Sequence, residues 1–138
     1  MKHTLVFCLS FCIGIMSLCM FLSCDHKTVN RFRGAEIQFD DTVIDLGDVP
    51  LTDIQHFSYR FTNVGDSGLV LFGVQPDCNS CTKVDYPSDT ISPGETGEIH
   101  VTFDGSERFV HGPHQFYIHV HSNSPKAYQD LEFKTDFL

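Results

Sequence analysis

The sequence is short of positive charge. Nine lysine and arginine residues stand against 18 aspartate and glutamate residues, which gives a formal net charge of −9. The acidic residues are spread along the chain, and a surface of this sign repels the phosphate backbone of nucleic acids. We therefore expect no nucleic-acid partner. The chain also lacks a basic amphipathic helix, so a membrane-surface helix is excluded as a means of attachment.

The motifs of common hydrolase and phosphate-binding sites are missing as well. The sequence contains no G-x-S-x-G, no phosphate-binding glycine loop and no Ser-His-Asp order. The acids of "DDTVIDLGD", residues 40–48, are unevenly spaced, are expected in loops that flank strands, and lack the D-x-D-x-D-G pattern of a calcium loop. We therefore predict that the protein is not an enzyme and has no cofactor.

One long apolar run is present, at the start of the chain. Residues 5–22 carry no charge, follow Lys2 and lead to Ser23 and Cys24. A charged start, an apolar run and a small residue before the cleavage point are typical of an export signal. The ending "FLSC" resembles the bacterial lipobox, which implies cleavage before Cys24 and lipidation of its thiol. An uncleaved anchor is the alternative, because about 18 apolar residues is the lower limit for spanning a bilayer.

Either interpretation places the rest of the chain outside the cytoplasm. We expect a lipid-anchored protein of the bacterial cell envelope, held to the outer membrane through Cys24, with its domain in the periplasm or at the surface. Several acyl chains anchor a protein stably, whereas one binds only marginally. The expected organisation is a signal peptide over residues 1–23, a tether over 24–35 and a folded domain over 36–138.

The cysteines fall into two groups. Of the six, three lie in the expected signal and Cys24 carries the lipid, which leaves Cys78 and Cys81. An isolated pair of cysteines in an exported chain is expected to form a disulfide. Because the loop between them is so short, this disulfide should contribute little to stability, at the lower end of the usual range of about 2–4 kcal/mol.

Two alternatives stay open for this C-x-x-C. Thiol-disulfide exchange favours a helix after the first cysteine, but "TKVDYP", residues 82–87, is typical of a strand. A site for zinc or another soft transition metal would join Cys78 and Cys81 to His111 and His114. If residues 82–87 form a strand and strand directions alternate, the loops that carry these four residues fall at the same end of the domain.

From residue 36 onward the sequence alternates between apolar and polar residues, which is the pattern of half-buried strands. The mostly apolar run at residues 69–75 could instead be buried on both faces. His119 and His121 are expected on a solvated outer face, and Asn63 is expected to cap a turn. The seven candidate strands are "AEIQFD" (35–40), "HFSYRFTN" (56–63), "LVLFGVQ" (69–75), "TKVDYP" (82–87), "GEIHVTFD" (97–104), "HQFYIHVHSN" (114–123) and "DLEFKTDF" (130–137).

Seven short strands with turn residues between them, and no helical pattern, predict an all-β fold, a single antiparallel β-sandwich of about seven strands. The sequence has no tryptophan, which excludes the antibody type of core, where a tryptophan packs on a disulfide between the sheets. The core must therefore be built from the phenylalanines, which number 13 in the full chain and fewer after removal of the signal, together with Ile, Val, Leu and Tyr.

Several phrases together resemble one family. "VIDLGDVP", "FSYRFTNVGDSGLVLFGVQPDCNSCT", "YPSDTISPGETGEIHVTFD" and "HVHSNSP" occur in the order seen in the DUF1573 family. The resemblance covers roughly residues 36–137 and implies an immunoglobulin-like domain, related to the ASH and MSP-type sandwiches and common in short bacterial lipoproteins. The family loop usually reads Cys-Gly-Cys-Thr, whereas the loop from Cys78 to Thr82 is one residue longer.

The resemblance implies no known biochemical activity. Together with the missing catalytic motifs, it predicts a non-enzymatic binding or scaffold module of the envelope. We expect a membrane contact through the N-terminal lipid and an envelope protein as partner, with strand addition at a sheet edge as one mode of contact.

Overall fold

The structure is a computed structural model, and it describes residues 34–106 and 109–138 of the chain. The expected signal peptide, the lipidation site Cys24 and the tether up to residue 33 lie outside the described residues. Within the described part, no helix has the length and apolar character needed to cross a membrane.

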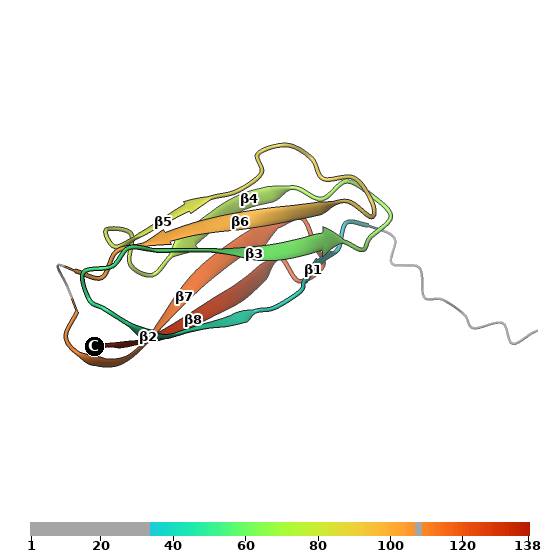
Figure 1. The fold of residues 1–138 in the computed structure, drawn as a ribbon. Helices are drawn as coiled ribbons and strands as arrows, with labels where there is room; N and C mark the ends of the chain where they lie inside the picture. Colours follow the sequence, from blue (N-terminus) through green and yellow to red (C-terminus); the bar gives the residue numbers. More distant parts are fainter. Residues whose placement is uncertain (1–33, 107–108) are drawn as a thin grey trace, which may run out of the picture. The chain divides into compact units, whose positions relative to one another are not determined.

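Eight strands form two four-stranded sheets that face each other in a sandwich (Figure 1). The first sheet has the order β1-β3-β6-β5, and the second has the order β2-β8-β7-β4. This confirms the predicted all-β, immunoglobulin-like sandwich. The strands are β1 (Ile37–Phe39), β2 (Val43–Val49), β3 (Gln55–Asn63), β4 (Leu71–Pro76), β5 (Thr82–Asp85), β6 (Thr96–Phe103), β7 (Gly112–Ser122) and β8 (Tyr128–Phe137).

In the strands without a register shift, alternate side chains face the core and solvent. In β3, Tyr59 and Phe61 are buried while Ser58 and Arg60 are exposed, which is the pattern that the sequence predicts. Phe61 lies opposite Gly97 of β6, whose missing side chain leaves room for the phenylalanine ring. In such regular strands the period of two sets which side chains reach the core.

The core is built around phenylalanine, as the absence of tryptophan predicts. The ring of Phe103 from the first sheet contacts Phe116 and Phe133 of the second, with centroids 4.7 and 5.0 Å apart. Phe137 and Phe109 extend this cluster toward one end of the sandwich. Tilted and edge-on contacts of this kind add about 0.5–1.5 kcal/mol per pair beyond the burial of apolar area.

The segment expected as an acidic loop is a strand instead. β2 runs along the edge of the second sheet and pairs in parallel with β8, whereas the other strand pairs among the described residues are antiparallel. Ile44 and Leu46 turn inward, so the acids alternate with core residues, and a bulge at Gly47, with φ of 66°, interrupts the period. The described part of the chain therefore has eight strands, with one parallel pair among them.

The apolar run at residues 69–75 is not buried on both faces. β4 lies at an edge of the second sheet, and the side chain of Phe72 is 59% exposed. A register shift between Leu71 and Gly73 turns Phe72 outward while Leu71 and Val74 stay in the core. The apolar composition of this strand predicts burial on both faces, and this prediction is wrong because one face is exposed.

Candidate binding face

The two sheets present very different outer faces. The large hydrophobic side chains that are exposed on strands all belong to the second sheet, and the other exposed ones lie between strands or at the chain end. The outward side chains of β3 and β6 in the first sheet are polar, including His56, Ser58, Arg60, Glu98, His100 and Thr102. We call the outward side chains of the second sheet, with Asp77 directly after β4, the second-sheet face: Val43, Asp45, Phe72, Gln75, Asp77, Pro113, Gln115, Tyr117, His119, His121, Tyr128, Asp130, Glu132, Lys134 and Asp136.

An aromatic row crosses one end of this face, formed by Phe72, His121 and Tyr128. The rings of His121 and Tyr128, which lie opposite each other on β7 and β8, are stacked with centroids 4.3 Å apart and planes only 6° apart. Phe72 of β4 approaches the other side of His121 at 5.1 Å. Phe72 and Tyr128 remain 59% and 66% exposed, so the row offers aromatic surface to a partner.

Beside the aromatic row, His119 joins two carboxylates. Its Nδ1 lies 2.7 Å from Oδ1 of Asp130 on β8, and its Nε2 lies 2.8 Å from Oδ1 of Asp77, just after β4. Both ring nitrogens donate to carboxylates only when the imidazole is protonated. The hydrogen bonds to Asp130 and Asp77 accordingly raise the pKa of His119 above its ordinary value. This Asp–His–Asp bridge ties β4, β7 and β8 together on the surface.

The second sheet also carries most of the negative charge of the strands. Its four strands hold five carboxylates and one lysine, whereas those of the first sheet hold two acidic and two basic residues. The lysine, Lys134, pairs with Glu132 at 2.9 Å, which also raises the pKa of Lys134. The second-sheet face therefore combines exposed aromatic rings with excess negative charge.

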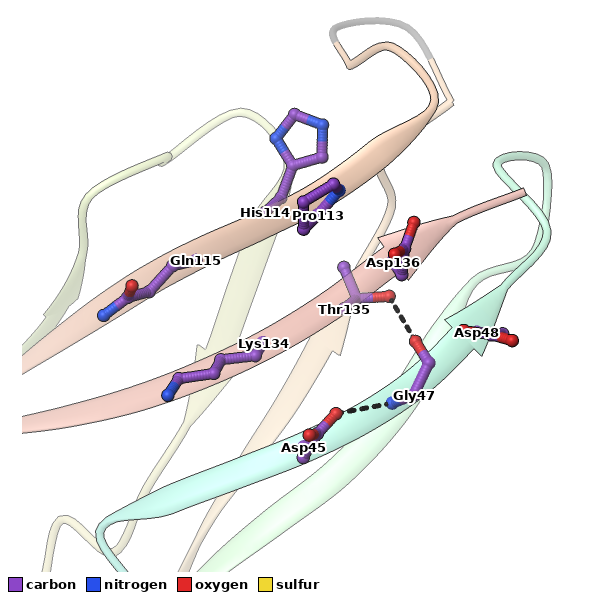
Figure 2. Close-up of a pocket in the computed structure, with 9 residues that line it drawn as sticks. All are labelled: Asp45, Gly47, Asp48, Pro113, His114, Gln115, Lys134, Thr135 and Asp136. Carbon is purple, nitrogen blue, oxygen red and sulfur yellow. Dashed lines mark hydrogen bonds between the residues drawn. The ribbon is translucent and has the colours of Figure 1, made fainter.

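A hollow of about 450 Å³ lies where β2, β8 and β7 run side by side (Figure 2). Its floor is shaped by the bulge at Gly47, whose N–H donates to Asp45 Oδ1 at 2.8 Å and whose carbonyl accepts from Thr135 Oγ1 at 3.2 Å. Figure 2 shows the nine residues that line the hollow. Three of them are aspartates, Asp45, Asp48 and Asp136, and one is a lysine, Lys134.

The C-x-x-C forms a corner between β4 and β5. Cys78 and Cys81 are joined by a disulfide, with 2.11 Å between the sulfurs, and Cys81 is buried. The N–H of Thr82 donates to the carbonyl of Cys78 at 2.9 Å, and β5 begins there, so a strand follows the cysteines where a redox site of the thioredoxin type has a helix.

The four residues of the metal hypothesis do not gather into a site. The loops do share one end of the sandwich, because Asp104, directly after β6, donates its N–H to the carbonyl of Cys81. The ring of His114, however, packs on Phe109 and Phe137, and its Nε2 contacts the carbonyl of Val110 at 2.8 Å. Among residues 34–106 and 109–138, no group of three His, Cys, Asp or Glu side chains could hold a metal ion.

Several residues of the second-sheet face were not singled out from the sequence. His119 and His121 lie on an outer face, but each has specific partners rather than solvent alone. Asp77, Asp130, Phe72 and Tyr128 carry no motif. Asp130 and Tyr128 are indicated only by their alternate positions on β8, whereas Asp77 follows β4 and Phe72 lies at a register shift. The register that brings these residues together cannot be read from one strand at a time.

Comparison with known proteins gives a family and a fold. The profile of the family described as "Protein of unknown function (DUF1573)" matches residues 37–137. No curated protein matches the sequence. A protein of unknown function from Porphyromonas gingivalis W83 is similar in structure, with a TM-score of 0.66 and 16% identity over 82% of this chain and 51% of the other, so this chain spans about half the length of that protein.

Two further solved structures share the sandwich. The YadV chaperone has a TM-score of 0.58 at 14% identity, covering 74% of this chain and 52% of its own. The ASH/PapD-like domain 7 of human CEP192 has a TM-score of 0.55 at 9% identity, covering 76% of this chain and 87% of its own. At such low identity these similarities establish the fold alone.

Proposed function

The chain belongs to the DUF1573 family, and from that premise we propose that it is a non-enzymatic binding module of the bacterial cell envelope. Its immunoglobulin-like sandwich presents a surface to a partner protein, and lipid on Cys24 holds the domain to the membrane. The role is to bind or to scaffold, without chemical conversion of the partner.

One observation carries this proposal, namely the exposed aromatic surface of the second-sheet face. Phe72 and Tyr128 are more than half exposed, whereas the outward positions of β3 and β6 are polar. Aromatic side chains are enriched at protein interfaces, where they supply much of the binding energy. A face that differs from its counterpart in this way is expected to be the one that a partner covers.

The polar pairs of the first sheet support a non-enzymatic role. Ser58 Oγ lies 2.7 Å from Nδ1 of His100, which resembles the start of a nucleophilic relay. The carboxylate of Glu98 faces the same nitrogen at 3.9 Å. A relay needs the acid and the hydroxyl on opposite ring nitrogens. This arrangement therefore does not activate Ser58.

The second-sheet face is a better candidate for contact with a partner than the edges of the same sheet. Strand addition needs a regular edge, and bulges protect an edge from it. Both edge strands of the second sheet have register shifts, in β2 between Asp45 and Asp48 and in β4 between Leu71 and Gly73. These irregularities favour contact through side chains.

The binding role is tested by capture from a bacterial envelope extract. The mature protein, beginning at Cys24, is immobilised beside a variant with Phe72→Ser and Tyr128→Ser and a control with His56→Ser and His100→Ser on the first sheet. We expect the protein and the control to retain the same envelope component and the aromatic variant to lose it. Equal retention by all three, or retention by none, would contradict the proposal.

The lipid anchor is tested separately by fractionation. The full chain and a Cys24→Ser variant are expressed in a bacterium that processes lipoproteins, and membrane and soluble fractions are separated. We expect the full chain in the membrane fraction and a mass consistent with acylation of Cys24. Membrane retention of the variant at an unprocessed mass would favour the uncleaved anchor instead.

A further inference from the structure

We propose that the second-sheet face binds an extended, arginine-bearing segment of a partner protein. The inference rests on the proposed binding function and specifies the chemistry of the partner. The aromatic row stacks with a guanidinium group, and the carboxylates beside the row and along β8 pair with the positive charges of the segment.

The charge of the face selects a basic partner. The strands of the second sheet carry five carboxylates and one lysine, and that lysine is already paired with Glu132 at 2.9 Å. The strands of the first sheet carry balanced charge. A surface of this kind attracts positively charged segments and repels acidic ones. Charge complementarity therefore distinguishes this sheet from the first one.

The aromatic row favours arginine over lysine. The ring of Tyr128 stacks on His121 on one side and is 66% exposed, and Phe72 is 59% exposed at the other end of the row. A planar guanidinium stacks on an aromatic face while its N–H groups, which point outward in the guanidinium plane, reach a neighbouring carboxylate. A lysine ammonium has no plane to stack and is more strongly hydrated.

A carboxylate is held at the right place for this pairing. Asp130 follows Tyr128 by two residues on β8, so the two side chains lie on the same face about 7 Å apart along the strand. His119 binds Oδ1 of Asp130 and Oδ1 of Asp77. Among the described residues, no other side chain binds either carboxylate, so the second oxygen of each is available to an incoming guanidinium.

The spacing of the face sets the length of the segment. The outward row of β8 leads from Tyr128 past Asp130 to Asp136 at the hollow. Eight residues of strand span about 27 Å, so an extended segment of roughly nine residues would reach both ends. At the far end, Asp45, Asp48 and Asp136 line a hollow of about 450 Å³ that can admit a second basic side chain.

Three labelled nine-residue peptides test the proposal, with the repeating sequences Gly-Ser-Arg, Gly-Ser-Lys and Gly-Ser-Glu. Fluorescence anisotropy measures their binding to the mature protein at low and physiological salt. We expect the arginine peptide to bind most tightly and the glutamate peptide not to bind. The stacking contribution should make the arginine peptide about 2- to 30-fold tighter than the lysine peptide.

Variants locate the site. Tyr128→Ala and Asp130→Asn should each weaken binding of the arginine peptide, and Glu98→Gln on the first sheet should leave it unchanged. Amide shifts in NMR spectra should move on β4, β7 and β8 and stay constant on β3 and β6, and the spectra also show that each variant is folded. Equal binding of the three peptides, or binding that is insensitive to Tyr128→Ala and Asp130→Asn, would overturn the inference.

The outcomes separate this inference from the proposed function. Capture that depends on Phe72 and Tyr128, without binding of the arginine peptide, keeps the binding module and rejects the basic segment. Peptide binding without any captured envelope component supports the chemistry of the face and rejects the envelope role. A dimer that the Phe72→Ser variant abolishes, or binding of a neutral oligosaccharide in place of the peptide, would assign the face to another occupant.

Discussion

The hydroxyl of Tyr59 donates a hydrogen bond of 2.6 Å to the main-chain carbonyl of Glu132, which ties β3 of the first sheet to β8 of the second. Tyr59 is almost fully buried, and burial together with the nearby carboxylate of Glu132 raises the pKa of Tyr59 far above its usual range. The phenol therefore stays protonated, and the two sheets are joined by a neutral hydrogen bond across the core.

Removing this hydroxyl should be costly. Tyr59→Phe keeps the ring but leaves the carbonyl of Glu132 without its donor, and we expect the free energy of unfolding to fall by about 1–3 kcal/mol. Urea denaturation measures the change. Tyr128→Phe, at an exposed tyrosine, is the control and should change stability by less than about 0.5 kcal/mol. Equal effects of the two substitutions would refute a role for the hydrogen bond between the sheets.

Asn63 should be the most sensitive polar side chain of the fold. It is fully buried, its Oδ1 accepts from the N–H groups of Glu36 and Gly65, and its Nδ2 donates to the carbonyls of Ser67 and Ile91. It caps the turn after β3, as predicted from the sequence, and also holds the start of β1.

Asn63→Ala removes one hydrogen bond from each of four main-chain groups, and we expect a loss of at least about 2 kcal/mol of stability. Asn63→Asp should also destabilise, because the carboxylate cannot donate to the two carbonyls. The matched control is Asn123→Ala, since Asn123 bonds to Val70 and Gly68 at the exposed surface. A smaller effect at Asn63 than at Asn123, measured by chemical denaturation, would contradict this account.

The Asp–His–Asp bridge should make stability depend on pH. The carboxylates of Asp130 and Asp77 raise the pKa of His119 in the folded state. Protonation therefore stabilises the fold fully below the unfolded pKa of about 6.5, and this contribution is lost as the pH rises through the higher folded value. Because all three side chains are about half exposed, the effect should be less than about 1 kcal/mol.

This prediction is tested by measuring the free energy of unfolding of the wild-type chain and of the His119→Gln variant, by urea denaturation at pH 5.5 and pH 9. The stability advantage of the wild-type chain should be larger at the lower pH. His56→Gln serves as the control, because His56 contacts only the neutral hydroxyl of Thr102 among the described side chains. An advantage that is constant, or that grows with pH, would be inconsistent with a protonated bridge.

The disulfide should matter little to global stability. The corner from Cys78 to Cys81 is also held by the bond from Thr82 N–H to the Cys78 carbonyl and by the bond from Asp104 N–H to the Cys81 carbonyl. Reduction of the wild-type protein should cost no more than about 2 kcal/mol, because the closed loop is so short. Thermal melts with and without reductant measure this, and Cys78→Ser should match the reduced protein. Unfolding on reduction would show that the corner is essential.

The sequence predicts the strands with regular alternation and fails where the alternation breaks. Tyr59 and Phe61 of β3 are buried as the period of two requires. The sequence of β2 predicts a loop because its aspartates and the bulge at Gly47 disturb the period, and because β2 lies at an edge where one side of the strand faces solvent. The orientation of Phe72 likewise depends on a register shift that no local pattern reveals.

The candidate binding face could be predicted less well than the fold. The Asp–His–Asp bridge and the aromatic row each combine residues from three separate parts of the chain. The bridge consists of Asp77, His119 and Asp130, and the row consists of Phe72, His121 and Tyr128. Alternation indicates that each side chain points outward but not which residue lies beside it. The partners become known only when the order and register of β4, β7 and β8 are known.

The parallel pairing of β2 with β8 constrains when the domain can fold. Val43 lies opposite Glu132, so an early strand of the domain finds its neighbour only in the last one. Contacts between residues so far apart in sequence slow folding, and the unpaired edge of an early strand is prone to aggregate. The ribosome therefore releases β2 long before β8 has been made, and the second sheet can close only after β8 is available.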